Sequence, residues 1–166
     1  CRQTGFAMLC ETNPQEVMDL SPVAHLAAIE GKVPFLNFFD GFRTSHEIQK
    51  VACWDYADLK EMCNMKAVEE FRQHALNPEH PAARGCHENG DCFFQHREAC
   101  NRYYDELPAV VEKYMGKINE KLGTNYQLFN YYGAPDADRV IVAMGSINDV
   151  AEEVIDYMNA HGEKVG

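Results

Sequence analysis

The sequence predicts an α/β protein built on a parallel sheet, and three observations lead to this fold class. Residues 5–9 form a short apolar run, residues 33–39 form a second one, and the segment between them has helical periodicity. Because parallel strands need a crossover connection, usually a helix, this order predicts a βαβ unit. A further apolar run at residues 140–144, again followed by helical periodicity, predicts the start of a second α/β unit.

The first helix carries recognisable signals at both ends. Thr12 or Asn13 is suited to the N-cap, and Pro14 is suited to the first helical turn. Gly31 is placed to end the helix. The nearly continuous apolar run at residues 33–39 is typical of a strand that is covered on both faces.

The middle of the chain is predicted to be helical, then irregular, then helical again. Residues 56–76 are periodic enough for one or two helices, whereas residues 77–102 contain several prolines and glycines and read as a long loop. Residues 107–122 place their apolar side chains on one helical face. We take residues 1–125 as one domain and the aromatic-rich residues 126–138 as a connector.

The second unit is predicted to occupy residues 139–166. A short buried strand at residues 140–144 is expected to lead into a helix. Ser146 is placed to cap that helix, with Asp149 at the spacing of a capping box. The partner strands of such a unit are not in the sequence, and both ends of the chain are expected to be cut through structure.

Composition excludes several classes of function. The net charge is −11 over 166 residues, which argues against binding to nucleic acid or to an anionic membrane surface. No apolar stretch approaches the roughly 20 residues of a membrane helix. Seven cysteines are an odd number, which argues against a disulfide framework and favours a reducing compartment.

The densest group of reactive side chains follows the second predicted strand, where open α/β sheets build their sites. This loop contains Asp40, Arg43, Thr44, His46 and Glu47. One interpretation is an active-site or domain-contact loop. The alternative, which physical chemistry alone favours, is structural: an Asp40–Arg43 ion pair, with Thr44 or Ser45 capping the next helix.

A second group contains the residue types that bind zinc, namely Cys86, Cys92, His96 and Cys100. It contains no pair of cysteines separated by two residues, which most structural zinc sites use, and its spacing does not match iron–sulfur patterns. Free thiols and a surface histidine in a long loop are therefore the favoured interpretation.

Six segments of the chain, in order, resemble the pyruvate:ferredoxin (flavodoxin) oxidoreductase family, also called pyruvate synthase. They are residues 2–9, 33–35, 38–47, 77–81, 131–137 and 139–146. The stretch at residues 39–47 is highly specific by itself. The resemblance covers essentially the whole chain and implies that it is an internal fragment of a much larger enzyme.

The resemblance also implies an architecture and a reaction. Residues 1–125 would be the later half of a domain like the pyrimidine-binding domain of thiamine diphosphate enzymes. Residues 139–166 would begin a domain like the carboxy-terminal domain of transketolases. The intact enzyme, expected to be a homodimer, would oxidatively decarboxylate pyruvate with coenzyme A, and would pass electrons to ferredoxin or flavodoxin. It would use thiamine diphosphate with Mg²⁺ and [4Fe–4S] clusters.

The family's catalytic and cofactor-binding residues are expected to lie outside this chain, so the fragment alone should be inactive and should bind no cofactor. The loop at residues 40–47 matches a family signature without a specific catalytic role, and we expect it to shape the sheet edge and a domain or subunit contact. A related 2-oxoacid oxidoreductase, an NADP-linked fusion and a standalone zinc-binding module remain alternatives. Cytoplasm is expected for a bacterial source, and an anaerobic organelle is an option for a protist.

Overall fold

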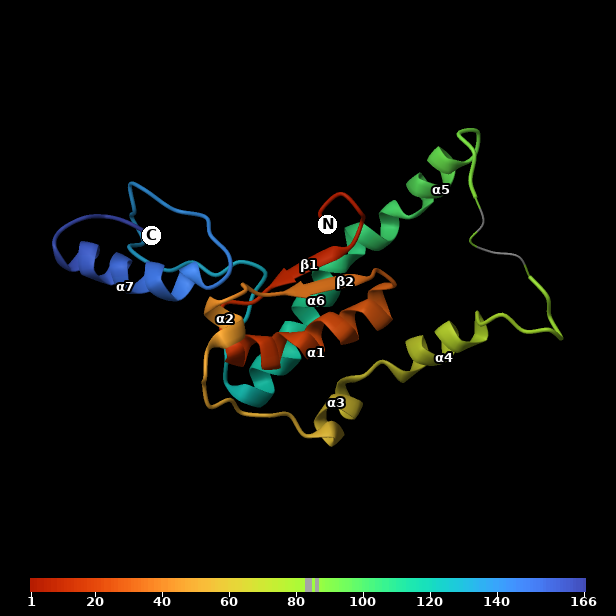
Figure 1. Ribbon diagram of the computed structural model, residues 1–166, viewed down its shortest axis with the longest axis horizontal. Helices are drawn as coiled ribbons and strands as arrows, with labels where there is room; N and C mark the ends of the chain where they lie inside the picture. The colour runs from red at the N-terminus through yellow and green to blue at the C-terminus, as the bar shows by residue number, and fades with distance from the viewer. Residues whose placement is uncertain (83–84, 86) are drawn as a thin grey trace.

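The computed structural model describes residues 1–82, 85 and 87–166 of the chain. Two strands and seven helices are assigned in this described part, and Figure 1 shows their arrangement. They are β1 (Ala7–Cys10), α1 (Pro14–Gly31), β2 (Phe35–Phe38), α2 (Arg43–His46), α3 (Tyr56–Met62), α4 (Met65–Gln73), α5 (Phe93–Ala99), α6 (Asn101–Leu122) and α7 (Ile147–Ala160).

The predicted βαβ unit is confirmed. Strands β1 and β2 pair in parallel, with Ala7 opposite Phe35 and Cys10 opposite Phe38, and α1 is the crossover between them. Because both strands run the same way, their carboxyl ends meet at one edge of the sheet. The α/β class predicted from the sequence is therefore the observed one.

Helix α1 begins and ends where its local signals place it. The Asn13 side chain accepts a hydrogen bond from the backbone N–H of Glu16 at 3.0 Å, and the Glu16 carboxylate accepts one from the backbone N–H of Thr12 at 2.7 Å. This reciprocal arrangement satisfies two donors at the helix start. Lys32, in the left-handed conformation, follows Gly31 and ends the helix.

A proline inside α1 is compensated by a distant side chain. Pro22 has no N–H, so the carbonyl of Met18, four residues earlier, lacks its helical donor. The indole N–H of Trp54 donates to that carbonyl at 3.2 Å. The segment after α2 is thereby held against α1.

The core lies between the sheet, α1 and α6. Gly31 allows the close approach of these helices, since a Cβ at this position would lie 2.8 Å from the Leu107 side chain. The buried apolar cluster comprises Leu20, Val23, Leu26, Ala27, Val33, Met62, Leu107, Val111, Tyr114, Met115 and Ile118. Partly buried residues of both strands pack against this cluster.

The expectation that residues 33–39 form a strand covered on both faces is wrong for the described chain. All four residues of β2 are half-buried. In β1, Met8 is 43% exposed, and Phe6 and Phe39 beside the sheet are similarly exposed. The reason is that α1 and α6 supply an apolar layer on one face of the sheet, and the described residues supply none on the other.

The helical middle is confirmed, with more helix than expected. Helices α3 and α4 fill the predicted residues 56–76, each with a side-chain N-cap, from Asp55 and Asn64. Helix α5 and the first two residues of α6 lie inside the predicted long loop. The prolines and glycines that indicate a loop end at Gly90, so helix can form after it. Helix α6 begins before Pro108, which therefore lies inside the helix.

The strand expected at residues 140–144 is not formed. The neighbouring Arg139 makes an isolated parallel bridge with Val165, and the Ile141 N–H donates to the Gly166 carbonyl at 2.9 Å. A strand needs a partner along its length, and within the described chain pairing stops there, which leaves Val142 90% exposed. Helix α7 follows as predicted and lies at one end of the molecule in Figure 1, beside the C-terminus.

Within residues 1–82, 85 and 87–166, none of the helices combines the length and the apolar character that a membrane crossing requires.

Candidate functional site

The candidate site lies at the carboxyl edge of the sheet, where hydrogen bonds join segments that are far apart in sequence. Glu11 and Thr12 follow β1, and the loop of residues 40–47 follows β2. In Figure 1 this loop, with α2, lies beside the first turns of α1 and faces α7. The position of the loop at this edge agrees with the interpretation of the sequence.

Asp40 contacts the start of α7. Its carboxylate accepts a hydrogen bond from the backbone N–H of Ser146 at 2.7 Å. The side chain of Ser146 and then its backbone N–H lower the pKa of the Asp40 carboxyl. Gly145 makes the approach feasible, because its φ is +84° and a Cβ there would lie 2.6 Å from Asp40 Oδ1. Asp40 therefore caps α7 from a distance of more than 100 residues in sequence.

Two interpretations made from local sequence are corrected by this contact. The Asp40–Arg43 ion pair is not among the salt bridges of the described residues. The Ser146 side chain makes no capping hydrogen bond, so the predicted capping box with Asp149 is wrong. In a capping box the Asp149 carboxylate would accept the Ser146 N–H, and the Asp40 carboxylate accepts that N–H instead.

Thr44 and Thr12 join the loop to the turn between β1 and α1. Thr44 is 4% exposed, and its hydroxyl donates to the Thr12 carbonyl at 3.1 Å. The Thr12 hydroxyl in turn accepts a hydrogen bond from the Asn148 side chain at 3.2 Å. Thr44 therefore does not cap a following helix, and three segments far apart in sequence are held together at Thr12.

The other side of the loop is open to solvent. Phe42 is 86% exposed and has φ of +56° and ψ of −64°, a backbone conformation that a bulky residue rarely adopts. Its ring stacks on His46, with ring centroids 5.5 Å apart. Arg43 and Glu47 are exposed beside it. Strained backbone that presents exposed aromatic and charged side chains is typical of a contact or binding surface.

Glu11 is a member of this edge that the sequence analysis did not single out. Its side chain is 0% exposed, and burial raises the pKa of its carboxyl to about 8. Burial, followed by the carboxylates of Glu11, Asp40 and Glu16, also raises the pKa of the Cys10 thiol. The sequence contains a signal that could have identified Glu11 as a member of the site, because Glu11 directly follows the carboxyl end of an apolar strand.

This chemistry does not fit a diphosphate or its metal ion. Carboxylates dominate the inside of the edge, and they would repel an anion instead of binding it. No three His, Cys, Asp or Glu side chains in the described part of the chain gather in an arrangement that could hold a metal ion. The described residues of this edge are suited to joining segments of chain.

The described side chains of the predicted zinc group, Cys92, His96 and Cys100, each contact a different partner. The Cys92 thiol donates to the Asn89 carbonyl at 3.6 Å, and the Cys100 thiol donates to the His96 carbonyl at 3.3 Å. The His96 ring lies 2.5 Å from a carboxylate oxygen of Glu88. Cys86, the fourth proposed ligand, lies outside the described residues.

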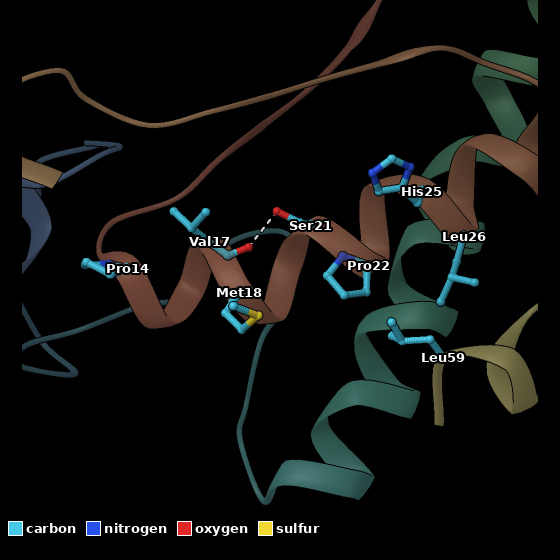
Figure 2. A pocket seen from close by; sticks show the side chains of 8 residues that line it. All are labelled: Pro14, Val17, Met18, Ser21, Pro22, His25, Leu26 and Leu59. Atoms are coloured by element: carbon cyan, nitrogen blue, oxygen red, sulfur yellow. Dashed lines mark hydrogen bonds between the residues drawn. The ribbon is translucent and has the colours of Figure 1, made fainter. Parts of the chain in front are cut away.

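A groove of about 480 Å³ lies on the outer face of α1 and is shown in Figure 2. Side chains of α1 between Pro14 and Leu26 line it, together with Leu59 of α3. Its polar side chains are Ser21, whose hydroxyl donates to the Val17 carbonyl at 2.6 Å, and His25. No Asp, Glu, Lys or Arg is among the residues that line the groove.

The chain was compared with known proteins and protein families. Residues 1–116 match the family described as pyruvate flavodoxin/ferredoxin oxidoreductase, thiamine diphosphate-binding. A pyruvate-flavodoxin oxidoreductase of Enterobacter agglomerans is 58% identical over 99% of the chain, and a pyruvate:ferredoxin oxidoreductase of Moorella thermoacetica is 53% identical over 99%. The chain spans about 14% of the length of each. A pyruvate dehydrogenase [NADP(+)] of Cryptosporidium parvum is 48% identical over 99% of the chain, which covers 9% of that protein.

Proposed function

This chain belongs to the pyruvate flavodoxin/ferredoxin oxidoreductase family, and we propose that it is a segment of an enzyme that oxidatively decarboxylates pyruvate. The observation that supports the proposal is identity of 53–58% to two such oxidoreductases along 99% of the chain. The family membership inferred from six sequence segments is thereby confirmed. The reaction proposed for the longer polypeptide consumes pyruvate and coenzyme A, and it yields acetyl-CoA, carbon dioxide, one proton and two electrons.

The proposed electron acceptor is flavodoxin or ferredoxin. Relatives named for these carriers are 45–58% identical to the chain, and relatives named for NADP⁺ are 41–48% identical. A substrate other than pyruvate, and NADP⁺ as acceptor, are the alternatives within the same class. The longer enzyme is proposed to be a homodimer of the cytoplasm.

Thiamine diphosphate, Mg²⁺ and [4Fe–4S] clusters are proposed for the longer polypeptide. The residues at the sheet edge described above do not fit the diphosphate or its metal ion, so we assign to this chain no step of the reaction. Its proposed role is to position other parts of the enzyme.

We propose that the loop of residues 40–47 performs this positioning, as a contact between two domains. Residues 1–125 would form the first domain, residues 126–138 the connector, and residues 139–166 the start of the second, transketolase-like domain. The hydrogen bonds from Ser146 to Asp40 and from Asn148 to Thr12 cross between these parts. The exposed side of the loop, with Phe42, Arg43, His46 and Glu47, is proposed to contact a further domain or the second subunit.

The experiment uses the full-length polypeptide that contains this chain. It should reduce flavodoxin or ferredoxin only when pyruvate and coenzyme A are both present, and should do so more slowly with larger 2-oxoacids. Reduction of NADP⁺ at a comparable rate, or preference for another 2-oxoacid, would move the assignment to one of the alternatives. The 166-residue chain alone serves as the control: binding of one thiamine diphosphate per chain would contradict the positioning role.

A further inference from the structure

The side chains of Glu11 and Asn37 leave three oxygen atoms buried without a hydrogen-bond partner. Neither carboxyl oxygen of Glu11 makes a hydrogen bond of normal geometry, and neither does the amide oxygen of Asn37. Glu11 is 0% exposed within this chain alone. A group from elsewhere could therefore reach its carboxyl only if the surrounding residues moved apart. An ionised carboxylate without a partner in such a place is strongly unfavourable.

Asn37 is the immediate neighbour of this carboxyl and is held in place by α1. It lies in β2, opposite Leu9, two positions before Glu11. Polar contact with its side chain lowers the pKa of the Glu11 carboxyl, and the larger effect of burial outweighs this contact. The Asn37 amide nitrogen donates to the Ser21 hydroxyl at 2.8 Å. Because the Ser21 hydroxyl itself donates to a backbone carbonyl, the amide nitrogen is the donor in this contact. The amide oxygen of Asn37 is thus left buried without a hydrogen-bond donor.

The charged groups around Glu11 carry the same sign. Glu16 of α1 acts on it directly, and its carboxylate is fixed by the Thr12 N–H. In the loop, the Asp40 carboxylate contributes to the raised pKa of the thiol of Cys10, which directly precedes Glu11. From α7, Glu152 lies close enough to Glu16 for the Glu16 carboxylate to contribute to the raised pKa of the Glu152 carboxyl, after burial, Asp149 and Asp156. No cation is among the groups that act on Glu11 in the described chain.

We propose that Glu11 and Asn37 form a buried proton-binding site, in which Glu11 is a neutral carboxylic acid at neutral pH and donates its O–H to the Asn37 amide oxygen. A proton bound to Glu11 provides a donor for the Asn37 amide oxygen, and it fits without any change in the packing around the two side chains. Folding then takes up one proton from solvent, because the same carboxyl is ionised in the unfolded chain. The site joins the carboxyl ends of β1 and β2.

The position of the site links its proton to the contacts of the sheet edge. Glu11 directly precedes Thr12, which holds both the loop through Thr44 and α7 through Asn148. The pKa of the Glu11 carboxyl is raised on folding from 4.5 to about 8. The folded state therefore binds more protons than the unfolded state between these values, and the stabilisation is lost as pH rises through about 8.

The test measures the protonation state itself. The infrared band of a protonated carboxylic acid should be present in the protein at pH 7 and absent from Glu11→Gln. Glu153→Gln, at an exposed position of α7, is the matched control and should keep the band. In unfolding experiments, the unfolding constant of the wild type should rise about tenfold per pH unit between roughly pH 5 and 8 relative to that of Glu11→Gln.

An infrared spectrum at pH 7 that Glu11→Gln leaves unchanged would overturn the proposal. So would identical pH profiles of unfolding for the wild type and this variant. If Glu11→Gln fails to fold, the same infrared measurement is made on the wild type with isotope-labelled glutamate. Its carboxylic acid band should persist to about pH 8. Complete loss of the band below pH 6 would contradict the proposal.

Discussion

Removal of one hydroxyl, in Tyr114→Phe, tests how the chain holds α1 against α6. Tyr114 is 0% exposed, and its hydroxyl donates to a carboxylate oxygen of Glu30 at 2.6 Å. Two further donors reach the same carboxylate: Lys113, at 2.7 and 2.9 Å, and Asn64, at 3.1 Å. Helix α1, helix α6 and the start of α4 thus meet at Glu30.

The expected loss follows from the nature of the bond. A hydrogen bond to a charged group contributes roughly 1.5–3 kcal/mol to the free energy of unfolding. Phenylalanine preserves the ring packing, and the Glu30 carboxylate keeps its other two partners, so the remaining charge is not left alone. We therefore expect Tyr114→Phe to lower the free energy of unfolding by about 2 kcal/mol.

The assay is urea denaturation followed by circular dichroism. Tyr132→Phe is the matched control, because its hydroxyl also donates to a carboxylate, that of Asp156 at 2.8 Å, but at an exposed position. It should change the midpoint little. Equal losses in the two variants, or no loss in Tyr114→Phe, would refute the reasoning that burial makes this bond important.

The pH dependence gives a second check on the same network. Burial opposes ionisation of Glu30, but hydrogen bonds from its three partners outweigh burial and lower the pKa of its carboxyl to about 2. A lowered folded-state pKa contributes stability that is present above the ordinary value of 4.5 and is lost as pH falls through about 2. The difference between Tyr114→Phe and the wild type should therefore persist at pH 4.

Two further substitutions test the core and the sheet edge. Ile118→Ala, at a residue that is 0% exposed, should lower the free energy of unfolding by about 2–5 kcal/mol. Leu122→Ala, on the same helix but 39% exposed, should lower it by much less in the same urea titration. Gly145→Ala should release the contact between Asp40 and Ser146, measured as faster hydrogen exchange of the Ser146 amide. Gly162→Ala is its control, since both glycines have positive φ but nothing lies within 4 Å of a Cβ at Gly162. Equal exchange at Ser146 in both variants would contradict the proposed contact.

Several parts of the fold were predictable because their signals are local. Asn13 and Pro14 define the start of α1, and the helix ends at Gly31 as predicted, with Lys32 as its C-cap. The parallel pairing of β1 and β2 also followed, since a helix between two apolar runs restricts the topology to very few arrangements. The placement of the loop after β2 at the carboxyl edge is a consequence of that topology.

Other parts could not be predicted because they depend on segments far apart in sequence. Ser146 has the sequence of an N-cap, but Asp40, 106 residues away, provides the cap. Residues 140–144 have the composition of a strand, but a strand also needs a partner, and pairing within the described chain stops at Arg139 and Ile141. In both cases the local sequence is suited to the predicted feature, but contacts between distant segments decided whether the feature formed.

The sequence by itself determined the family, the α/β class and the location of the signature loop, because these depend on the order and periodicity of residues. Only the tertiary structure decided the roles of individual side chains at that loop. It directed Asp40 and Thr44 inward and left Phe42 and His46 outside. It also buried the Glu11 carboxyl without a hydrogen-bond partner. The burial of a carboxyl depends on which segments meet around it, and no local pattern of residues specifies those segments.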